Sequence, residues 1–300
     1  MNALVAGFVT IDTIHLPVRT ITSVGGPPSY AGLICSRFGL DTFALTKIGN
    51  DFPPDQFTWL ARNGISLRPI DRSATQKTTS FKIESKGEGR TLTLVNRCED
   101  ISASQLPDTQ FNASLVSPVA NEVSAALLSD IAKHSDFTFL DPQGFVRAFD
   151  GKGEVSMSKL KNADILSRVD AIKMDQGEAE AVTGKEAPTD ALRKLAELGL
   201  RKGVVTRGAE PAYVLDGNRI FSVPVPSVKV VDSTGAGDIL GGTIVSWYLK
   251  TREFLWSACF GIAASSLSLH MIALAKVDLP ISVDDQARRL YSQASPVATV

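Results

Sequence analysis

The sequence predicts an α/β protein with a mostly parallel central sheet flanked by helices. Short apolar runs alternate with stretches of helical spacing through much of the 300 residues, which is the pattern of repeated βαβ units. A chain of this length can form a single large α/β core. Two alternating runs joined by a short turn break the pattern and predict a small antiparallel flap. We therefore expect one domain, residues 1–300, with a small β lid.

The predicted sheet is built from short apolar runs that are separated by helical patterns. The stretch 190–198 places four apolar side chains on one face of an amphipathic helix, and Gly199 follows it as a stop signal. The expected strands lie at residues 3–7, 42–46, 137–140, 171–174 and 203–206, and a further helix is expected over about 28–38.

The lid is expected near residues 13–22 and 76–97, because these segments look extended and lack helices to cover both faces. Its hairpin turns at 85–89. A second hairpin is expected over 213–223, and residues 295–300 are expected to fray. An exposed edge of the lid would allow a homodimer to form there.

Composition excludes several classes of protein. The 31 basic and 32 acidic residues nearly balance, whereas a nucleic-acid binder normally has a basic surplus. Cys35, Cys98 and Cys259 lie far apart without a CxxC pair, which argues against disulfides and structural zinc and favours a reducing cytoplasm. Residues 1–7 read as a first strand and not as a signal peptide.

One apolar segment has the length of a membrane span. Residues 254–275 carry no charged side chain apart from His270, and about 20 apolar residues can cross a bilayer. Several serines interrupt the segment, and it is rich in small residues. We therefore expect a buried helix of a large α/β core and no membrane association.

The segment 228–238 carries the functional argument. A β-branched strand runs into Gly235, Ala236, Gly237 and Asp238, and a helical stretch follows. Glycines allow a close approach of backbone to ligand, and the free N–H groups at a helix start favour anions. A carboxylate beside an anion site can serve as base for an attacking hydroxyl in phosphoryl transfer. The alternative is an ordinary tight turn between a strand and a helix.

The longer run Asp-Ser-Thr-Gly-Ala-Gly-Asp, 232–238, resembles the signature Asp-Thr-x-Gly-Ala-Gly-Asp of the ribokinase (PfkB) family of carbohydrate kinases. Ser233 stands where a threonine is usual. The resemblance implies a ribokinase-like three-layer sandwich and an ATP- and Mg²⁺-dependent transfer of phosphate to a hydroxyl group. It assigns Asp238 as the catalytic base and the backbone of 235–237 as the anion hole.

Two N-terminal segments match the family's substrate-binding positions. Asp12 follows the first strand and resembles the aspartate that holds substrate hydroxyls. Gly25 and Gly26 precede a helix and look like the family's Gly-Gly substrate loop, although two prolines replace its usual continuation.

Two further segments match the positions that contact the phosphoryl donor. Asp175 and Glu178 lie where the family carries Asn-x-x-Glu, with aspartate at the asparagine position, and the match assigns Glu178 to Mg²⁺ through water. Thr206, Arg207 and Gly208 resemble the Thr-x-Gly turn that contacts nucleotide phosphates. An arginine there can neutralise phosphate charge.

Family members commonly bind a monovalent cation near the anion hole. The resemblance places Asp232 and Thr234 at that site, so K⁺ would be a further cofactor. The loop that usually completes the site carries residues 273–276 here, without the usual glycine, which leaves potassium activation open.

The segment 140–147 resembles a stretch found in myo-inositol kinases and their archaeal relatives, and so does 117–123. Gln143 and Arg147 could donate hydrogen bonds to a small polyol, either a sugar or an inositol. An arginine pairing with a neighbouring carboxylate in an ordinary turn is the other interpretation. A nucleoside kinase of the same family is the second functional hypothesis, and a non-catalytic regulatory protein on the same fold is the third.

Overall fold

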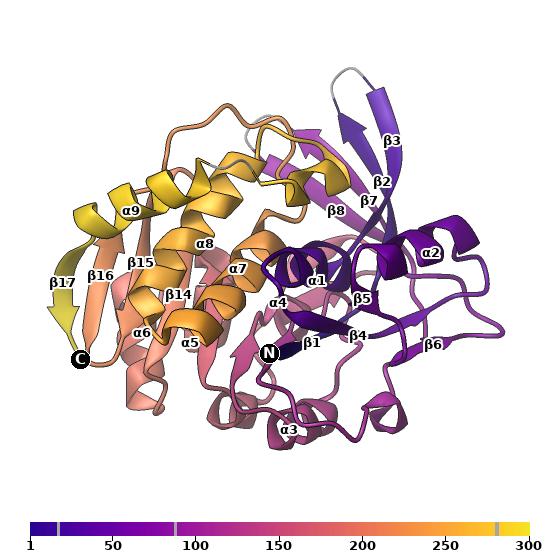
Figure 1. Cartoon of the computed structure of the whole chain (residues 1–300), viewed down its shortest axis with the longest axis horizontal. Helices are drawn as coiled ribbons and strands as arrows, with labels where there is room; N and C mark the ends of the chain where they lie inside the picture. Colours follow the sequence, from indigo (N-terminus) through magenta and orange to yellow (C-terminus); the bar gives the residue numbers. More distant parts are fainter. Residues whose placement is uncertain (17–18, 87–88, 280–281) are drawn as a thin grey trace.

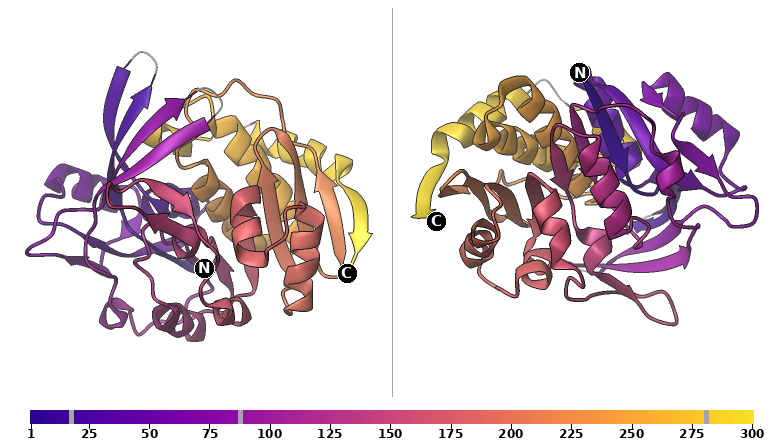
Figure 2. Two further views of the ribbon diagram at one scale, coloured as in Figure 1. Left: turned by 180° about the vertical axis from the view of Figure 1, so that it is seen from behind. Right: turned by 90° about the horizontal axis from the view of Figure 1, so that it is seen from below.

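The computed structural model describes residues 1–16, 19–86, 89–279 and 282–300. Helices cover both faces of a central, mostly parallel sheet (Figures 1 and 2). In the described residues its strands follow the order β17-β16-β15-β14-β13-β10-β9-β1-β4-β5, and β6 also pairs with β4. The parallel part comprises β1 (Asn2–Ala6), β4 (Asp41–Ile48), β5 (Ile65–Ser66), β6 (Ile70–Arg72), β9 (Ala113–Val116), β10 (Thr138–Leu140), β13 (Ala171–Asp175) and β14 (Lys202–Arg207).

Alternate residues of the central strands face two different cores. In β1, Ala3 and Val5 belong to one core, whereas Leu4 and Ala6 belong to the other. Side chains alternate along a strand, so an all-apolar strand is buried on both faces. The three-layer α/β sandwich predicted from the sequence is therefore confirmed.

Two sets of helices complete the outer layers. The first core packs under α1 (Pro27–Arg37), α7 (Ala236–Thr251), α8 (Phe254–Ser268) and α9 (Val283–Gln293). The second packs under α3 (Ala125–Lys133), α5 (Gln176–Thr183) and α6 (Pro188–Glu197). Shorter elements are α2 (Pro54–Arg62), α4 (Gln143–Val146), η1 (Ala103–Gln105), η2 (Ala163–Arg168) and η3 (Ala273–Val277).

A separate four-stranded sheet forms the lid beside the main sheet (Figure 1). Residues 17–18 and 87–88, which fall in the predicted lid segments, lie outside the described residues. The Leu94 N–H donates to the Gly153 carbonyl at 2.8 Å, which ties the lid to a small hairpin. The lid order is β3 (Arg19–Gly25), β2 (Thr10–Leu16), β7 (Ser80–Lys86) and β8 (Gly89–Asn96), and the hairpin is β11 (Arg147–Phe149) with β12 (Val155–Met157).

The prediction that residues 295–300 fray is wrong. β17 (Ser295–Thr299) pairs with β16 (Arg219–Val223) as an antiparallel edge strand. The expected hairpin 213–223 is present as β15 (Glu210–Asp216) and β16, and it extends the main sheet. The outer edge of β16 would otherwise leave backbone N–H and C=O groups without strand partners. The end of the chain satisfies these groups.

The apolar segment 254–275 forms α8 and the loop after it. α8 packs between α7 and α9, and most of its residues are buried. Among the described residues, no helix combines the length and apolar character that crossing a bilayer demands. The expectation of a buried helix is confirmed.

Close packing of α7 against α1 sets the position of α7. A Cβ added at Gly242 would lie 2.8 Å from both the Cα and the carbonyl oxygen of Ala31. Those are backbone atoms, which cannot rotate away. At the neighbouring Gly241 a Cβ would meet side-chain atoms at ordinary contact distances, Leu115 at 3.6 Å and Phe139 at 3.8 Å.

These two glycines give a matched test of the helix contact. We expect Gly242→Ala to lower the free energy of unfolding by about 1–3 kcal/mol, the usual cost of overpacking. Gly241→Ala should be neutral or stabilising, because alanine favours a helix over glycine by about 1 kcal/mol. Chemical denaturation of both variants checks this. Equal effects at the two positions would contradict the proposed backbone contact.

Candidate active site

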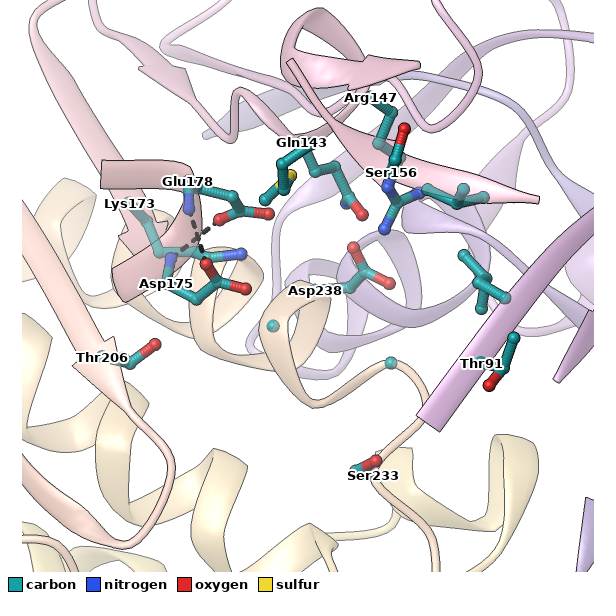
Figure 3. Close-up of a pocket in the computed structure, with 15 residues that line it drawn as sticks. Thr91, Gln143, Arg147, Ser156, Lys173, Asp175, Glu178, Thr206, Ser233 and Asp238 are labelled. Atoms are coloured by element: carbon teal, nitrogen blue, oxygen red, sulfur yellow. Dashed lines mark hydrogen bonds between the residues drawn. The ribbon is translucent and has the colours of Figure 1, made fainter. Parts of the chain in front are cut away.

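A cavity of about 500 Å³ opens at the carboxyl ends of the parallel strands. The ends of β13 and β14, the start of α7, the β11–β12 hairpin and the lid residues Thr91 and Leu92 line it (Figure 3). Open α/β sheets bind their ligands at this edge. A smaller cavity of about 60 Å³ adjoins it under the lid.

The start of α7 lies between the two cavities. Gly235 is the residue before the helix and has φ 76°, the left-handed region that favours glycine. A Cβ there would come 2.7 Å from ring atoms of the buried Tyr30. At Gly237 a Cβ would lie 2.8 Å from Lys173 Nζ. Gly235 is therefore required by its conformation and its contact, whereas a side chain at Gly237 would displace the Lys173 ammonium group. The first turn of a helix carries N–H groups without intrahelical partners.

Asp238 lies in that first turn and lines both cavities. Its carboxylate is thus placed where the two cavities meet, next to the helix start. The same turn supplies the backbone of Ala236, whose carbonyl accepts a hydrogen bond from Ser265 Oγ at 2.9 Å. This contact with α8 helps to fix the turn.

A buried ion pair forms the floor of the large cavity. Lys173 Nζ lies 2.6 Å from Asp141 Oδ2, and both side chains are less than a tenth exposed. Burial opposes the charge on Lys173, but Asp141 and Glu178 outweigh it, so the pKa of Lys173 lies above its usual range. None of the sequence motifs assigns a role to this pair. The available signal was a lysine inside the apolar run of β13, because a buried charge needs a partner.

Asp175 and Glu178 form a reciprocal cap at the start of α5. The Glu178 N–H donates to Asp175 Oδ1, and the Asp175 N–H donates to Glu178 Oε2, both at 2.7 Å (Figure 3). Both residues line the large cavity. Burial raises the pKa of Glu178 to about 7; Lys173 opposes this rise, and Asp141 adds to it. The aspartate at the family's asparagine position thus caps a helix.

Asp12 lines the small cavity, as expected for a substrate-binding residue. Its Oδ1 accepts from the Phe81 N–H at 3.1 Å, and its Oδ2 accepts from Thr10 Oγ1 at 2.8 Å. Gly26 also lines this cavity. Gly25 lies beside the carboxylate, since a Cβ there would come 2.3 Å from Asp12 Oδ2.

Gln143 and Arg147 line both cavities and point toward Asp238 (Figure 3). Gln143 Nε2 donates to Ser117 Oγ at 3.2 Å, and Arg147 Nη1 donates to the Val119 carbonyl at 3.0 Å. These contacts hold the two side chains at the junction of the cavities. The structure thus brings Gln143 and Arg147, from the segment 140–147, together with Asp238, from the segment 228–238.

The predicted phosphate-binding turn is only partly at the cavity. Thr206 lines it. Arg207 Nε instead donates to Gln176 Oε1 at 3.2 Å near the surface, and Gly208 forms the turn after β14 with φ 61°. Neither Arg207 nor Gly208 is among the residues that line the cavity.

Asp232 and Thr234 contact the ammonium group of Lys276. Lys276 Nζ donates to the carbonyl oxygens of Asp232 and Thr234, at 2.5 and 2.7 Å, and lies 3.2 Å from Asp232 Oδ2. Burial disfavours the charge on Asp232, but Lys276 and backbone N–H groups outweigh this effect, so its pKa lies below the usual range. The oxygens that were expected to hold K⁺ therefore contact a lysine.

The cavity has an incomplete set of metal ligands. In the described part of the chain, no group of three or more His, Cys, Asp or Glu side chains could hold a metal ion. Mg²⁺ typically keeps several waters and binds one or two carboxylates together with substrate phosphates. Glu178 and the adjoining Asp175 fit such an ion, because both carboxylates line the space that phosphates would fill.

Comparisons with known proteins agree with this geometry. Residues 6–275 match the pfkB family of carbohydrate kinases. The chain is 26% identical over 263 residues to the cytidine kinase of Thermococcus kodakarensis, covering 84% of this chain and 90% of that protein. It is 26% identical over 286 residues to the inositol 3-kinase of Arabidopsis thaliana, covering 91% and 75%.

Solved structures show the same fold. A pyrophosphate-dependent kinase of the ribokinase family, solved as a sulfate complex, superposes with a TM-score of 0.80 at 20% identity, and the alignment covers 93% of this chain and all of that one. The matched family spans the lid, the large cavity and the start of α7. The chain belongs to the pfkB family of carbohydrate kinases.

Proposed function

We propose that this protein transfers the terminal phosphate of Mg²⁺-bound ATP to a hydroxyl of a small polyol, a sugar or an inositol. The observation that carries the proposal is the place of Asp238. It lies at the junction of the two cavities, in the first turn of α7, facing both. A base and an anion-binding helix start are thus combined on one turn, as phosphoryl transfer requires.

Each residue has a defined task in this reaction. Asp238 accepts the proton of the acceptor hydroxyl. The hydroxyl oxygen bonds to the terminal phosphorus of the donor while the bond from that phosphorus to the leaving phosphate breaks. The N–H groups of the 235–237 turn stabilise the charge that builds on the transferred group. One such donor in a comparable anion hole contributes about 3–4 kcal/mol.

Lys173 and the Asp175–Glu178 cap face the donor side of the cavity. Mg²⁺ would neutralise charge on the donor phosphates, and Glu178 would hold it through water. Lys173 Nζ approaches the Gly237 backbone closely, so its charge is placed beside the anion hole. Thr206 adds a hydroxyl donor at the same wall.

The small cavity supports a compact polyol as acceptor. Polar groups of Asp12, Gln143 and Arg147 line it together with the apolar lid residues Phe81 and Ile83. A cavity with a few polar groups among apolar side chains suits a single hydroxylated ring. The likeness to an inositol 3-kinase supports the same acceptor class.

A panel of donors and acceptors tests the proposal. The folded protein is incubated with ATP or pyrophosphate and with myo-inositol, aldoses, ketoses and cytidine, and phosphate esters are detected by mass spectrometry. We expect ATP to support ester formation on an inositol or a sugar. Turnover of cytidine alone would replace the polyol acceptor, and turnover with pyrophosphate alone would replace ATP. No ester with any pair would support a non-catalytic binding protein.

Asp238→Asn tests the base. We expect turnover to fall about 10²–10⁴-fold, the usual effect of losing a general base, while the fold and donor binding are retained. Steady-state kinetics and calorimetric titration with the donor measure the two effects. Asp190, an exposed residue in the first turn of α6, provides the matched control, since Asp190→Asn should leave turnover unchanged. Near-normal turnover of Asp238→Asn would exclude this base.

Glu178→Gln tests the raised pKa. The pKa of Glu178 rises from 4.5 to about 7 on folding, so the folded state binds this proton more tightly than the unfolded state. The stability contributed by the tightly bound proton on Glu178 is therefore complete below pH 4.5 and is lost as pH rises toward 7. We expect the stability of the wild type relative to Glu178→Gln to fall across this window, by at most about 1.4 kcal/mol per pH unit.

Denaturation curves at several pH values measure this difference. The control is Glu180→Gln, on the exposed side of the same helix, which should follow the wild-type profile. A relative stability that stays constant between pH 4.5 and 7 would show that Glu178 is charged throughout in the folded protein.

A further inference from the structure

Lys276 lies in an unusual position for a lysine. Its side chain is fully buried in η3, in an apolar loop after α8. Lysine is almost never buried completely unless its charge is paired. Its ammonium group has three N–H donors, and three acceptors surround it: the carbonyl oxygens of Asp232 and Thr234 and the Asp232 carboxylate.

Asp232 also accepts hydrogen bonds from backbone N–H groups of both segments, 232–234 and 273–276. Asp232 Oδ1 accepts from the Thr234 N–H at 2.8 Å, and Asp232 Oδ2 accepts from the Ala273 N–H at 3.1 Å. The ammonium and the carboxylate thus form one linked unit between segments 232–234 and 273–276. Its charges cancel, so the unit can be buried without a net charge.

This unit is directly attached to the proposed anion hole. Thr234, whose carbonyl accepts from Lys276, is followed by Gly235, the left-handed residue immediately before α7. Asp238 follows three residues later. Lys276 touches neither of the two cavities, since it is absent from the residues that line them. It therefore acts on the site through the backbone of 232–235.

The ligand set around Nζ is that of a monovalent cation site. Backbone carbonyls and one carboxylate are hard oxygen ligands, and an ammonium group carries the same charge as K⁺ and is similar in size. An unattached ion would have to be recruited from solution, whereas a lysine is held there by the chain.

We infer that Lys276 is a built-in monovalent cation that positions the anion hole, so that this kinase works without potassium. The effect on turnover rests on the proposed phosphotransferase activity. The replacement of a bound cation by Lys276 does not, because the thermal midpoint tests it without any activity. Lys276 is a positioning residue, because it holds the loop before α7 and lines neither cavity.

The first test uses the unaltered protein. Its phosphotransferase rate and its thermal midpoint are measured in KCl, NH₄Cl and choline chloride at equal ionic strength. We expect the same values in all three salts. A rate or a midpoint that rises specifically with K⁺ would overturn the inference, and the thermal measurement gives this answer even if no acceptor has been found.

Two variants of the lysine complete the test. Lys276→Ala removes the ammonium group and leaves room for an ion among the same oxygens, whereas Lys276→Met fills that room with an uncharged chain. We expect turnover of both to fall about 10²-fold, the cost of a small misplacement of catalytic groups, mainly in kcat. K⁺ or NH₄⁺ should restore turnover and raise the thermal midpoint of Lys276→Ala only, because binding to the folded state stabilises it.

Lys229→Ala, at an exposed lysine three residues before Asp232, is the matched control and should behave as the wild type. Equal responses of Lys276→Ala and Lys276→Met to K⁺ would show a general salt effect and overturn the inference. If both variants fail to fold, the salt comparison on the wild type still decides it.

Discussion

The position of the first turn of α7 is the constraint on which the site depends. Three contacts set it: the backbone of α1 against Gly242, the Tyr30 ring under Gly235, and the Lys276 ammonium on the carbonyls before the turn. Two of these contacts leave no space for a side chain. The helix start is therefore directed at the carboxyl edge of the sheet, where Gly235, Gly237 and Asp238 line the same cavity.

Electrostatics then explain the residues around that turn. Three carboxylates, those of Asp141, Glu178 and Asp238, act on the single ammonium of Lys173. A polyphosphate entering this space would meet an excess of negative charge, and repulsion between like charges is strong where water is excluded. A proton on Glu178 or a divalent cation beside it relieves the excess. Burial is the main cause of the raised pKa of Glu178, and the neighbouring carboxylates add to it. The same carboxylates are the reason for the proposed Mg²⁺.

The small cavity is organised by the lid. Asp12 lies on β2, and its carboxylate accepts from the backbone of Phe81 on β7. One side chain thus joins two lid strands and also lines the small cavity. Because the Leu94 N–H on β8 donates a hydrogen bond to the Gly153 carbonyl, the lid is also coupled to the hairpin that begins at Arg147. The lid residues and Arg147, which line the small cavity together, therefore belong to one connected network.

The sequence by itself determined the mostly parallel sheet flanked by helices, because apolar periodicity and turn residues act over a few neighbouring positions. The three-layer ribokinase-like sandwich followed from the resemblance of the segment 232–238 to a family motif. The sequence also located Asp238 and the two glycines, since a motif needs only local order. Tertiary structure alone decided the pairs Lys173–Asp141 and Lys276–Asp232, whose members lie 32 and 44 residues apart. Such pairs depend on which strands and loops become neighbours, and a long-range strand order is not encoded in any local pattern. The same reason explains why the terminal strand was missed.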